Sequence, residues 1–306
     1  MTKVFIDGSA GTTGLRIHER LAERGDLTLI TLPEETRKDP MARKEALNAA
    51  DIAFLCLPDA AAVEAVSFLE NEKTVVIDTS TAHRTAPGWT YGFPELVGKE
   101  AIRNSHRIAN PGCHASGVVA LLAPLVRAGL LSGKEAISCF SLTGYSGGGK
   151  KMIAEYEGPE RDVLLSAPRM YGLTQSHKHL KEIQAVSGLA AAPLFCPIVG
   201  SFYSGMEVTV PLYAHQIKGG PEEILRVYKD TYREGLVRVV EGADEGGFLS
   251  AAAFSGRDDM QISVFGNEER ILLVSRFDNL GKGASGAAIQ NMNLVLGAPE
   301  GAGLNV

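Results

Sequence analysis

Cys113 has the sequence setting best suited to covalent chemistry. It follows the turn-forming residues Asn110, Pro111 and Gly112, and it precedes a strongly apolar stretch, Gly117–Leu131, which predicts a helix beginning at or just after the cysteine. A thiol at a helix N-terminus has its thiolate stabilised by the helix dipole and the backbone amides, so its pKa falls below the usual value of about 8.5. The same amides stabilise the oxyanion that forms on a bound carbonyl. These residues therefore predict nucleophilic attack on an acyl group.

Two histidines, His177 and His179, could manage the protons of such a reaction, because an imidazole titrates near neutral pH. Residues two apart in an extended stretch share a face, so one can be the acid/base while the other holds substrate. Zinc is the alternative for two histidines and a distant cysteine, but no further ligand stands at zinc spacing, so no metal is expected. We interpret the remaining histidines as surface or core residues; they are His18, His83, His106, His114 and His215.

A glycine-rich turn stands between the first strand-like run, Val4–Asp7, and the first helical pattern. A pyrophosphate needs exposed backbone amides and the positive end of a helix dipole, and side chains would block its approach. The spacing G-x-x-G-x-x-G differs from the more common G-x-G-x-x-G, but the strand–turn–helix context favours a dinucleotide site over a tight turn that serves only packing. The predicted cofactor-binding residues of this turn are Gly8, Ser9, Ala10, Gly11, Thr12, Thr13 and Gly14.

The choice of cofactor depends on the residues after the second strand-like run, Leu27–Leu32. A carboxylate at this place holds the ribose 2′-hydroxyl of NAD, and Glu34 or Glu35 could do so. Arg37 and Lys38 follow and could instead bind the 2′-phosphate of NADP. The residues alone leave both cofactors open, and each of these side chains could equally be a solvated loop charge.

Short, continuously apolar runs such as Asp51–Leu57 alternate with helical patterns such as Pro40–Ala50 in the first part of the chain. This alternation predicts an α/β domain with a Rossmann-type doubly wound parallel sheet that is covered on both faces. After Cys113 the strand patterns lengthen, as in Glu207–Tyr213 and Ile271–Phe277. The second part therefore predicts an α+β domain with a broad sheet for substrate binding and dimerisation. Irregular connectors are expected at 155–180 and 215–225.

Composition excludes several classes of protein. The chain has 306 residues, of which 45% are hydrophobic, and 30 basic against 36 acidic side chains give a net charge of −6. An acidic chain lacks the positive field of a nucleic-acid or membrane-surface binder, and no apolar run is long enough to span a membrane. The N-terminus shows no signal-peptide pattern, so a cytoplasmic protein is expected. The remaining cysteines lie in apolar strand or loop contexts and are interpreted as structural thiols; they are Cys56, Cys139 and Cys196.

Several motifs, in the right order and spread over nearly the whole chain, resemble the N-acetyl-gamma-glutamyl-phosphate reductase family. Asn110–Cys113 before an apolar helix resembles the family's active-site signature, and Gly8–Gly14 resembles its cofactor turn. The other matching segments are Asp78–Arg84 (D-x-S-x-x-x-R), Tyr91–Leu96 (Y-G-x-P-E-L), His177–His179 (H-R-H) and Asp278–Ala284 (D-N-L-x-K-G-A). Two departures, His114 and Ser116 in place of an aromatic residue and a threonine, and the missing proline in Leu180–Ile183, resemble the family's shorter branch.

The resemblance implies NADPH-dependent reduction of N-acetyl-gamma-glutamyl phosphate to N-acetylglutamate semialdehyde in arginine biosynthesis, with phosphate release from a Cys113 thioester. It favours His177 as the acid/base over His179, which would hold the substrate. It also implies that Arg84 binds the substrate phosphate through its planar fork. Further implied substrate contacts are Ser80 and Asn110, and Asn279 is implied at the nicotinamide end of the cofactor.

The loop Ser146–Lys150 is expected to be flexible and rich in donors, with Gly147 and Gly148 at the cofactor. The position of Asn279 implies that the C-terminal helix returns to the first domain. The expected dinucleotide-binding domain is 1–113 with 280–306, and the expected catalytic, substrate and oligomerisation domain is 114–279. A broad sheet in the second domain suits the interface of a homodimer or homotetramer.

Two other functions compete with this one. An aspartate-semialdehyde dehydrogenase-like acyl-phosphate reductase shares the cysteine chemistry, but the H-x-H segment and the sequence Pro111–Ser116 count against it. A non-catalytic nucleotide-binding sensor would need no nucleophile, and the intact Cys113, His177 and Arg84 count against it.

Overall fold

The computed structural model describes residues 1–306, which divide into two compact units. Unit 1 comprises Met1–Gly112 and Ala284–Leu304, and unit 2 comprises Cys113–Gly283 and Asn305–Val306. No helix of either unit combines the length and the apolar character that a membrane crossing requires.

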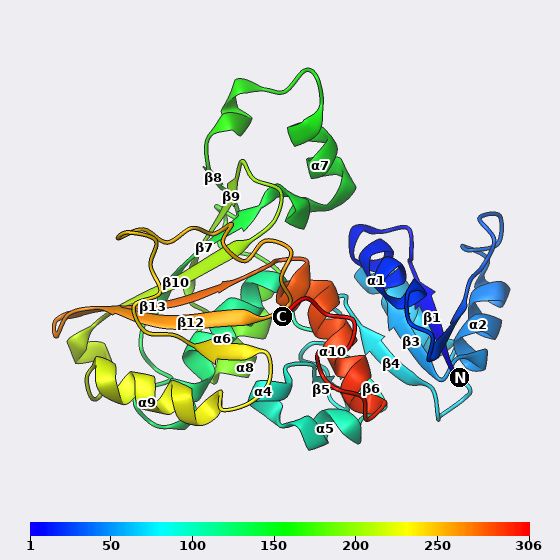
Figure 1. Ribbon diagram of the computed structural model, residues 1–306, viewed down its shortest axis with the longest axis horizontal. Helices are drawn as coiled ribbons and strands as arrows, with labels where there is room; N and C mark the ends of the chain where they lie inside the picture. Colours follow the sequence, from blue (N-terminus) through cyan, green and yellow to red (C-terminus); the bar gives the residue numbers. More distant parts are fainter. The chain divides into compact units, whose positions relative to one another are not determined.

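Unit 1 is built on a parallel sheet of six strands in the order β2-β1-β3-β4-β6-β5 (Figure 1). Every neighbouring pair is parallel. The strands are β1 (Thr2–Asp7), β2 (Leu27–Ile30), β3 (Ile52–Leu55), β4 (Val75–Asp78), β5 (Thr90–Tyr91) and β6 (Arg107–Ala109). The predicted doubly wound parallel sheet is confirmed.

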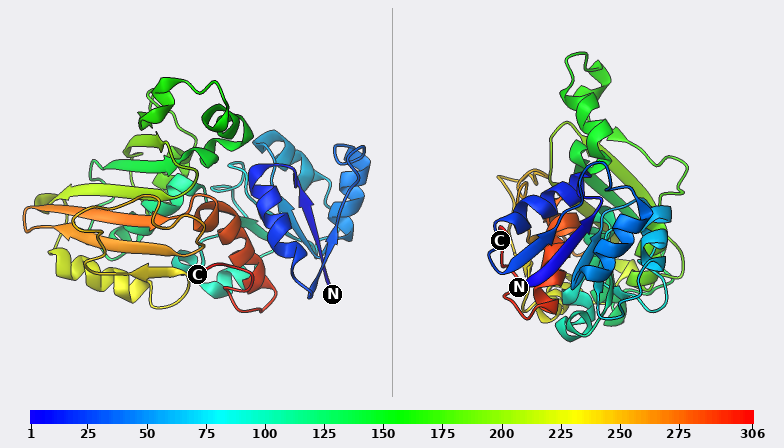
Figure 2. Two further views of the ribbon diagram at one scale, coloured as in Figure 1. Left: turned by 45° about the horizontal axis from the view of Figure 1, so that its top comes forward. Right: turned by 90° about the vertical axis from the view of Figure 1, so that its right-hand side faces the viewer.

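Helices cover both faces of this sheet, because its central strands β3 and β4 are buried along their whole length (Figures 1 and 2). Side chains of successive strand residues point to opposite faces, so Val4 of β1 packs in one core cluster with residues of α1 and α10, and Phe5 packs in another with residues of α2 and α3. The helices of unit 1 are α1 (Thr12–Ala22), α2 (Pro40–Ala49), α3 (Asp59–Ser67), α4 (Pro94–Val97), α5 (Lys99–Arg103) and α10 (Gly286–Val295).

Unit 2 is built on a mixed sheet of seven strands in the order β11-β12-β13-β10-β7-β9-β8. The pairs β7–β9 and β11–β12 are parallel, and the other pairs are antiparallel. The strands are β7 (Ser138–Gly144), β8 (Arg169–Met170), β9 (Leu194–Gly200), β10 (Met206–Tyr213), β11 (Val237–Val239), β12 (Met260–Gly266) and β13 (Arg270–Phe277). The predicted α+β character of this part is confirmed.

Three helices, α6 (Cys113–Arg127), α8 (His179–Ser187) and α9 (Pro221–Thr231), lie on one face of this sheet (Figure 1). α6 approaches the sheet closely because it carries Gly117, where an added Cβ would lie 2.5 Å from Val208 Cγ2 and 2.9 Å from Phe277 Cε1. The opposite face carries apolar side chains that remain exposed; they include Phe140, Leu194, Tyr213 and Leu272.

Parts of unit 2 are more regular than the sequence predicts. The expected connector 155–180 contains a 3₁₀ turn, Val163–Ser166, and the short strand β8. The expected connector 215–225 contains the start of α9, where Pro221 and the acidic residues Glu222 and Glu223 occupy the first turn, a favourable helix start that the prediction missed. The expected flexible loop Ser146–Lys150 consists instead of part of a 3₁₀ turn, Tyr145–Gly148, and the start of α7 (Gly149–Glu157).

Candidate active site

Cys113 is the first residue of α6, as the turn before it predicts, and its side chain is partly exposed. Gly283 leaves room for it, since a Cβ there would lie 3.1 Å from the Cβ of Cys113. Burial raises the pKa of both the Cys56 and the Cys139 thiols to about 12, which fits their interpretation as structural residues. Cys139 is buried, and Cys56 is partly exposed and lines the cavity of unit 1, but only Cys113 combines partial exposure with the N-terminus of a helix.

His177 and His179 lie together at the start of α8, with 4.9 Å between their ring centroids. The expectation of an extended stretch is wrong, because Lys178 between them has helical dihedral angles and His179 is already the first helical residue. The rings still meet, since a short turn can bring side chains two positions apart to one side. Burial lowers the pKa of His177, and the charge of Lys178 lowers it further, so the ring is neutral at physiological pH.

His114, interpreted from the sequence as a surface or core residue, is a core residue that also packs against both histidines. It is only 3% exposed, and its ring centroid lies 5.9 Å from that of His177 and 5.5 Å from that of His179. Its Nδ1 lies 2.6 Å from Ser141 Oγ, and its Nε2 lies 2.6 Å from the Tyr171 hydroxyl. Its place directly after the nucleophile was the one available signal; nothing in the sequence points to Ser141 or Tyr171. We call these residues with Cys113, His177 and His179 the cysteine–histidine cluster.

Within this cluster His114 cannot carry a proton as a cation. Burial, followed by the charges of His177 and Lys178, lowers its pKa to about 3. A neutral imidazole has one donor and one acceptor nitrogen, and both are engaged by hydroxyl groups here. No group of three or more histidine, cysteine, aspartate or glutamate side chains in the structure is arranged to hold a metal ion.

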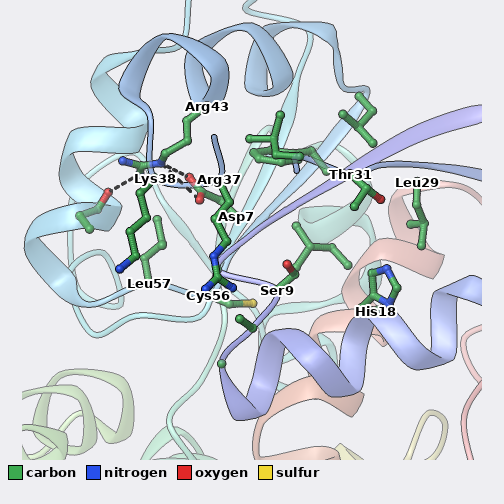
Figure 3. A pocket seen from close by; sticks show the side chains of 18 of the residues that line it. Asp7, Ser9, His18, Leu29, Thr31, Arg37, Lys38, Arg43, Cys56 and Leu57 are labelled. Atoms are coloured by element: carbon green, nitrogen blue, oxygen red, sulfur yellow. Dashed lines mark hydrogen bonds and ion pairs between the residues drawn. The ribbon is translucent and has the colours of Figure 1, made fainter. Parts of the chain in front are cut away.

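In unit 1 a cavity of about 430 Å³ opens at the ends of β1 and β3, and the turn after β1 lines it (Figure 3). Gly8 has φ +87°, a conformation that favours glycine, and a Cβ there would lie 2.3 Å from the carbonyl oxygen of Cys56. The Gly11 amide donates to the Gly8 carbonyl, and α1 begins at the next residue with no acidic side chain in its first turn. Of the predicted turn residues, Gly8, Ser9, Ala10 and Gly11 line the cavity.

The charged lining of this cavity is mostly basic. Arg37 and Lys38 line it, whereas Glu34 and Glu35 do not. Arg43 lies deeper and is engaged by carboxylates, with its Nε 3.0 Å from Asp7 Oδ2 (Figure 3). His18, interpreted from the sequence as a surface or core residue, also lines the cavity.

Arg84 and Asn110 meet at the ends of β4 and β6. Arg84 donates from Nε to the carbonyl oxygen of Asn110 and from Nη2 to that of Thr79, both at 3.0 Å. The Asn110 side chain is 1% exposed and donates to the carbonyl oxygen of Ala284. The arrangement fixes the guanidinium beside the strand ends, where open α/β sheets bind small ligands.

Ser80 belongs to a small buried network beside these residues. Its hydroxyl donates to Asp78 Oδ2 at 2.7 Å, and His83 Nδ1 lies 2.7 Å from the same oxygen. His83 stacks on Trp89 with ring centroids 4.1 Å apart. The Ser80 hydroxyl thus holds Asp78, and its contact with substrate stays a prediction.

Asn279 lies in unit 2 beside the turn that contains Gly147 and Gly148. It is 1% exposed, and its Nδ2 donates to Ser146 Oγ while its Oδ1 accepts from the Gly205 amide, each at 3.0 Å. Both glycines of the turn are exposed. Asn279 therefore anchors this turn through Ser146. The cofactor contacts expected of Asn279, Gly147 and Gly148 remain predictions.

The chain is similar to known proteins over almost its whole length. The model of the semialdehyde dehydrogenase NAD binding domain matches residues 3–105, and that of the semialdehyde dehydrogenase dimerisation domain matches residues 113–279. N-acetyl-gamma-glutamyl-phosphate reductase 2 of Pseudomonas putida is 45% identical over 98% of each chain. N-acetyl-gamma-glutamyl-phosphate reductase of Burkholderia lata is 47% identical over 97% of each chain.

Solved structures of lower identity share the fold. Aspartate semialdehyde dehydrogenase II of Vibrio cholerae matches with a TM-score of 0.71 at 20% identity, covering 97% of this chain and 98% of that one. Aspartate semialdehyde dehydrogenase of Candida albicans, solved with NADP, matches with a TM-score of 0.66 at 16% identity, covering 97% and 99%. At these identities the likeness shows the architecture alone.

Proposed function

The chain belongs to the N-acetyl-gamma-glutamyl-phosphate reductase family, and from that membership we propose that it reduces N-acetyl-gamma-glutamyl phosphate to N-acetylglutamate semialdehyde in arginine biosynthesis. Identities of 45–47% over nearly complete chains support this substrate over aspartyl phosphate, whose reductases match only at the level of the fold. The observation that carries the chemistry is Cys113, partly exposed at the start of α6 with the cysteine–histidine cluster around it.

Cys113 forms the covalent intermediate. Its Sγ attacks the acyl carbon, the bond from that carbon to the phosphate oxygen breaks, and inorganic phosphate leaves a thioester on Sγ. The nicotinamide cofactor supplies the hydride that reduces the thioester carbon to the aldehyde level. The carbon–sulfur bond then breaks, the aldehyde leaves, and Cys113 is again a thiolate.

His177 manages the proton in this scheme. Its ring is neutral at physiological pH, so it can accept the Cys113 thiol proton before attack and give it to the departing phosphate. His179, 4.9 Å away between ring centroids, is assigned to the substrate. Arg84 is assigned to the substrate phosphate, and Asn110 and Ser80 hold the strand ends beside it.

The nucleotide cofactor fits the cavity of unit 1, because Gly8 and Gly11, which line it, have no side chain that would obstruct a pyrophosphate. NADP is favoured over NAD, since Arg37 and Lys38 line the cavity and Glu34 and Glu35 do not. Asn279, Gly147 and Gly148 are assigned to the nicotinamide end.

A homodimer is proposed through the open face of the seven-stranded sheet. Register places Phe140 opposite Cys196 and Thr209, and Leu272 opposite Pro211 and Phe265, so these side chains share one face. Phe140 and Leu272 are 42% and 40% exposed in the single chain. Light scattering would test this: Phe140→Asp is expected to give monomers where the wild type gives dimers, and an unchanged mass would contradict it.

The decisive test of the function is turnover with N-acetylglutamate semialdehyde, phosphate and NADP. Cys113→Ala is expected to lower kcat by at least about 10³-fold while NADPH still binds, because only the nucleophile is lost. Cys196→Ala is the matched control and is expected to retain turnover. It removes a thiol from the face of the seven-stranded sheet that points away from α6. Equal rates with aspartate semialdehyde would favour the competing activity, and NADPH binding without turnover on either aldehyde would favour a sensor.

A further inference from the structure

Three residues from separate segments form one hydrogen-bonded chain in unit 2. Ser141 of β7 contacts His114 Nδ1, and His114 Nε2 contacts the Tyr171 hydroxyl, each at 2.6 Å. Tyr171 is itself fixed to β9, because its amide donates to the carbonyl oxygen of Pro197 at 3.0 Å. We call Ser141, His114 and Tyr171 the hydroxyl–imidazole relay.

The direction of the hydrogen bonds follows from what each group can do. Ser141 is 0% exposed, and its hydroxyl has His114 Nδ1 within reach as an acceptor, so its hydrogen is assigned to that bond. His114, neutral because burial lowers its pKa to about 3, then carries its one hydrogen on Nε2 and donates it to the Tyr171 oxygen. In this tautomer the hydrogen of the Tyr171 hydroxyl points away from the relay.

The relay ends on the reacting side of the cluster. Ser141 and His114 are buried, whereas Tyr171 is partly exposed, as are Cys113 and His177. The Tyr171 ring centroid lies 5.8 Å from that of His177, and His114 is the neighbour of Cys113 in α6. Burial raises the pKa of Tyr171, and the charge of Cys113 raises it further, so the hydroxyl keeps its hydrogen beside the thiolate.

We propose that Tyr171 donates this hydrogen bond to the substrate oxygen that becomes negative when the acyl carbon is tetrahedral at Cys113, and that Ser141 and His114 are positioning residues that aim it. The inference rests on the proposed function, because it needs an acyl group on Cys113. A donor held in advance at the place where charge develops stabilises the transition state more than the bound substrate. Loss of this hydrogen bond should therefore lower kcat and leave KM nearly unchanged.

The test compares Tyr171→Phe, Ser141→Ala and the double variant in the semialdehyde assay. Tyr171→Phe is expected to lower kcat about 10²–10³-fold with little change in KM, as for the loss of one oxyanion donor. Ser141→Ala is expected to lower kcat about 5- to 10-fold, because His114 loses the bond that fixes its donor nitrogen, and Ser141→Thr to restore it. The double variant is expected to be no slower than Tyr171→Phe, since the serine acts only through the tyrosine.

Tyr228→Phe is the matched control. It removes a second tyrosine hydroxyl of unit 2, a buried one that donates to the carbonyl oxygen of Leu121 at 2.7 Å, and it is expected to lower Tm without lowering kcat. Unchanged kcat in Tyr171→Phe, or effects of Ser141→Ala and Tyr171→Phe that multiply in the double variant, would overturn the relay. Retained turnover in Cys113→Ala would instead overturn the proposed function, so the two failures are distinguishable.

Discussion

In unit 1 the glycine-rich turn beside the cavity is one short contiguous segment, whereas in unit 2 the cluster gathers side chains from four elements or their ends. Gly8–Gly11 are consecutive in the chain and line the cavity through their position between β1 and α1. Cys113 and His114 come from α6, Ser141 from β7, Tyr171 from the segment after β8, and His177 from the start of α8. The turn is thus contained in local sequence, while the cluster of side chains depends on how distant segments pack.

The difference also appears in how each site controls charge. The cavity of unit 1 has basic residues, Arg37 and Lys38, at exposed or half-exposed positions. The cluster of unit 2 holds its imidazoles neutral by burial, which lowers the pKa of His114 and of His177. We therefore expect substitutions at the cavity of unit 1 to change cofactor affinity and substitutions in the cluster to change the rate of the chemical step.

The largest effect expected from this contrast belongs to His177. His177→Asn is expected to lower kcat about 10²–10⁴-fold, because the cluster loses its acid/base, while the affinity for NADPH stays unchanged. Steady-state kinetics and a fluorescence titration of NADPH would measure both. A loss of NADPH affinity as large as the loss of kcat would break the separation between the two regions.

Gly14 tests the packing of the cofactor turn. Gly14→Ala is expected to lower the free energy of unfolding by about 1–3 kcal/mol and to weaken NADPH binding, because its Cβ would lie 2.4 Å from the Gly8 carbonyl oxygen. Urea unfolding and the same titration would check it. Gly25→Ala is the control in the same unit, since its Cβ would have no neighbour within 4 Å; equal effects of the two would contradict the argument.

Lys38 tests the choice of cofactor. Lys38→Gln is expected to weaken NADPH binding about 5- to 10-fold and to leave NADH binding unchanged, since a charge-assisted contact to the 2′-phosphate is lost at an exposed position. Lys44→Gln makes the same change in charge on α2 outside the cavity and should alter neither affinity. Equal losses of affinity for NADPH and NADH would show that Lys38 does not contact the 2′-phosphate.

The smallest effect concerns pH. Burial lowers the pKa of His177 from its ordinary value, so the ring stays neutral to lower pH, and kcat/KM should be retained above that pKa and lost as the pH falls through it. Lys178→Gln removes a positive charge that lowers this pKa, and it is expected to move the acid limb upward by a few tenths of a pH unit. A shift in the opposite direction, or the same shift in Lys181→Gln, would show that another group controls the limb.

Sequence determined most of unit 1. Continuous apolar runs between amphipathic helices can satisfy their burial only in a parallel sheet covered on both faces, so this alternation predicted the parallel sheet, whose strand order the structure supplies. The same reasoning predicted that a helix starts at Cys113. Turn-forming residues end the preceding element, and the apolar run after them begins the next one. The motifs, carried by contiguous residues, identified the family for the same reason.

Tertiary structure alone decided the surroundings of Cys113. The extended geometry expected for His177–His179 was wrong, because α8 begins at His179 and its packing brings both rings against His114. Ser141 and Tyr171 lie 27 and 57 positions from His114, and no periodicity in the sequence records which buried hydroxyl will face which ring. Local sequence fixes backbone conformation through short-range sterics and burial, whereas partners across such separations are chosen only when the sheet and its helices close around them.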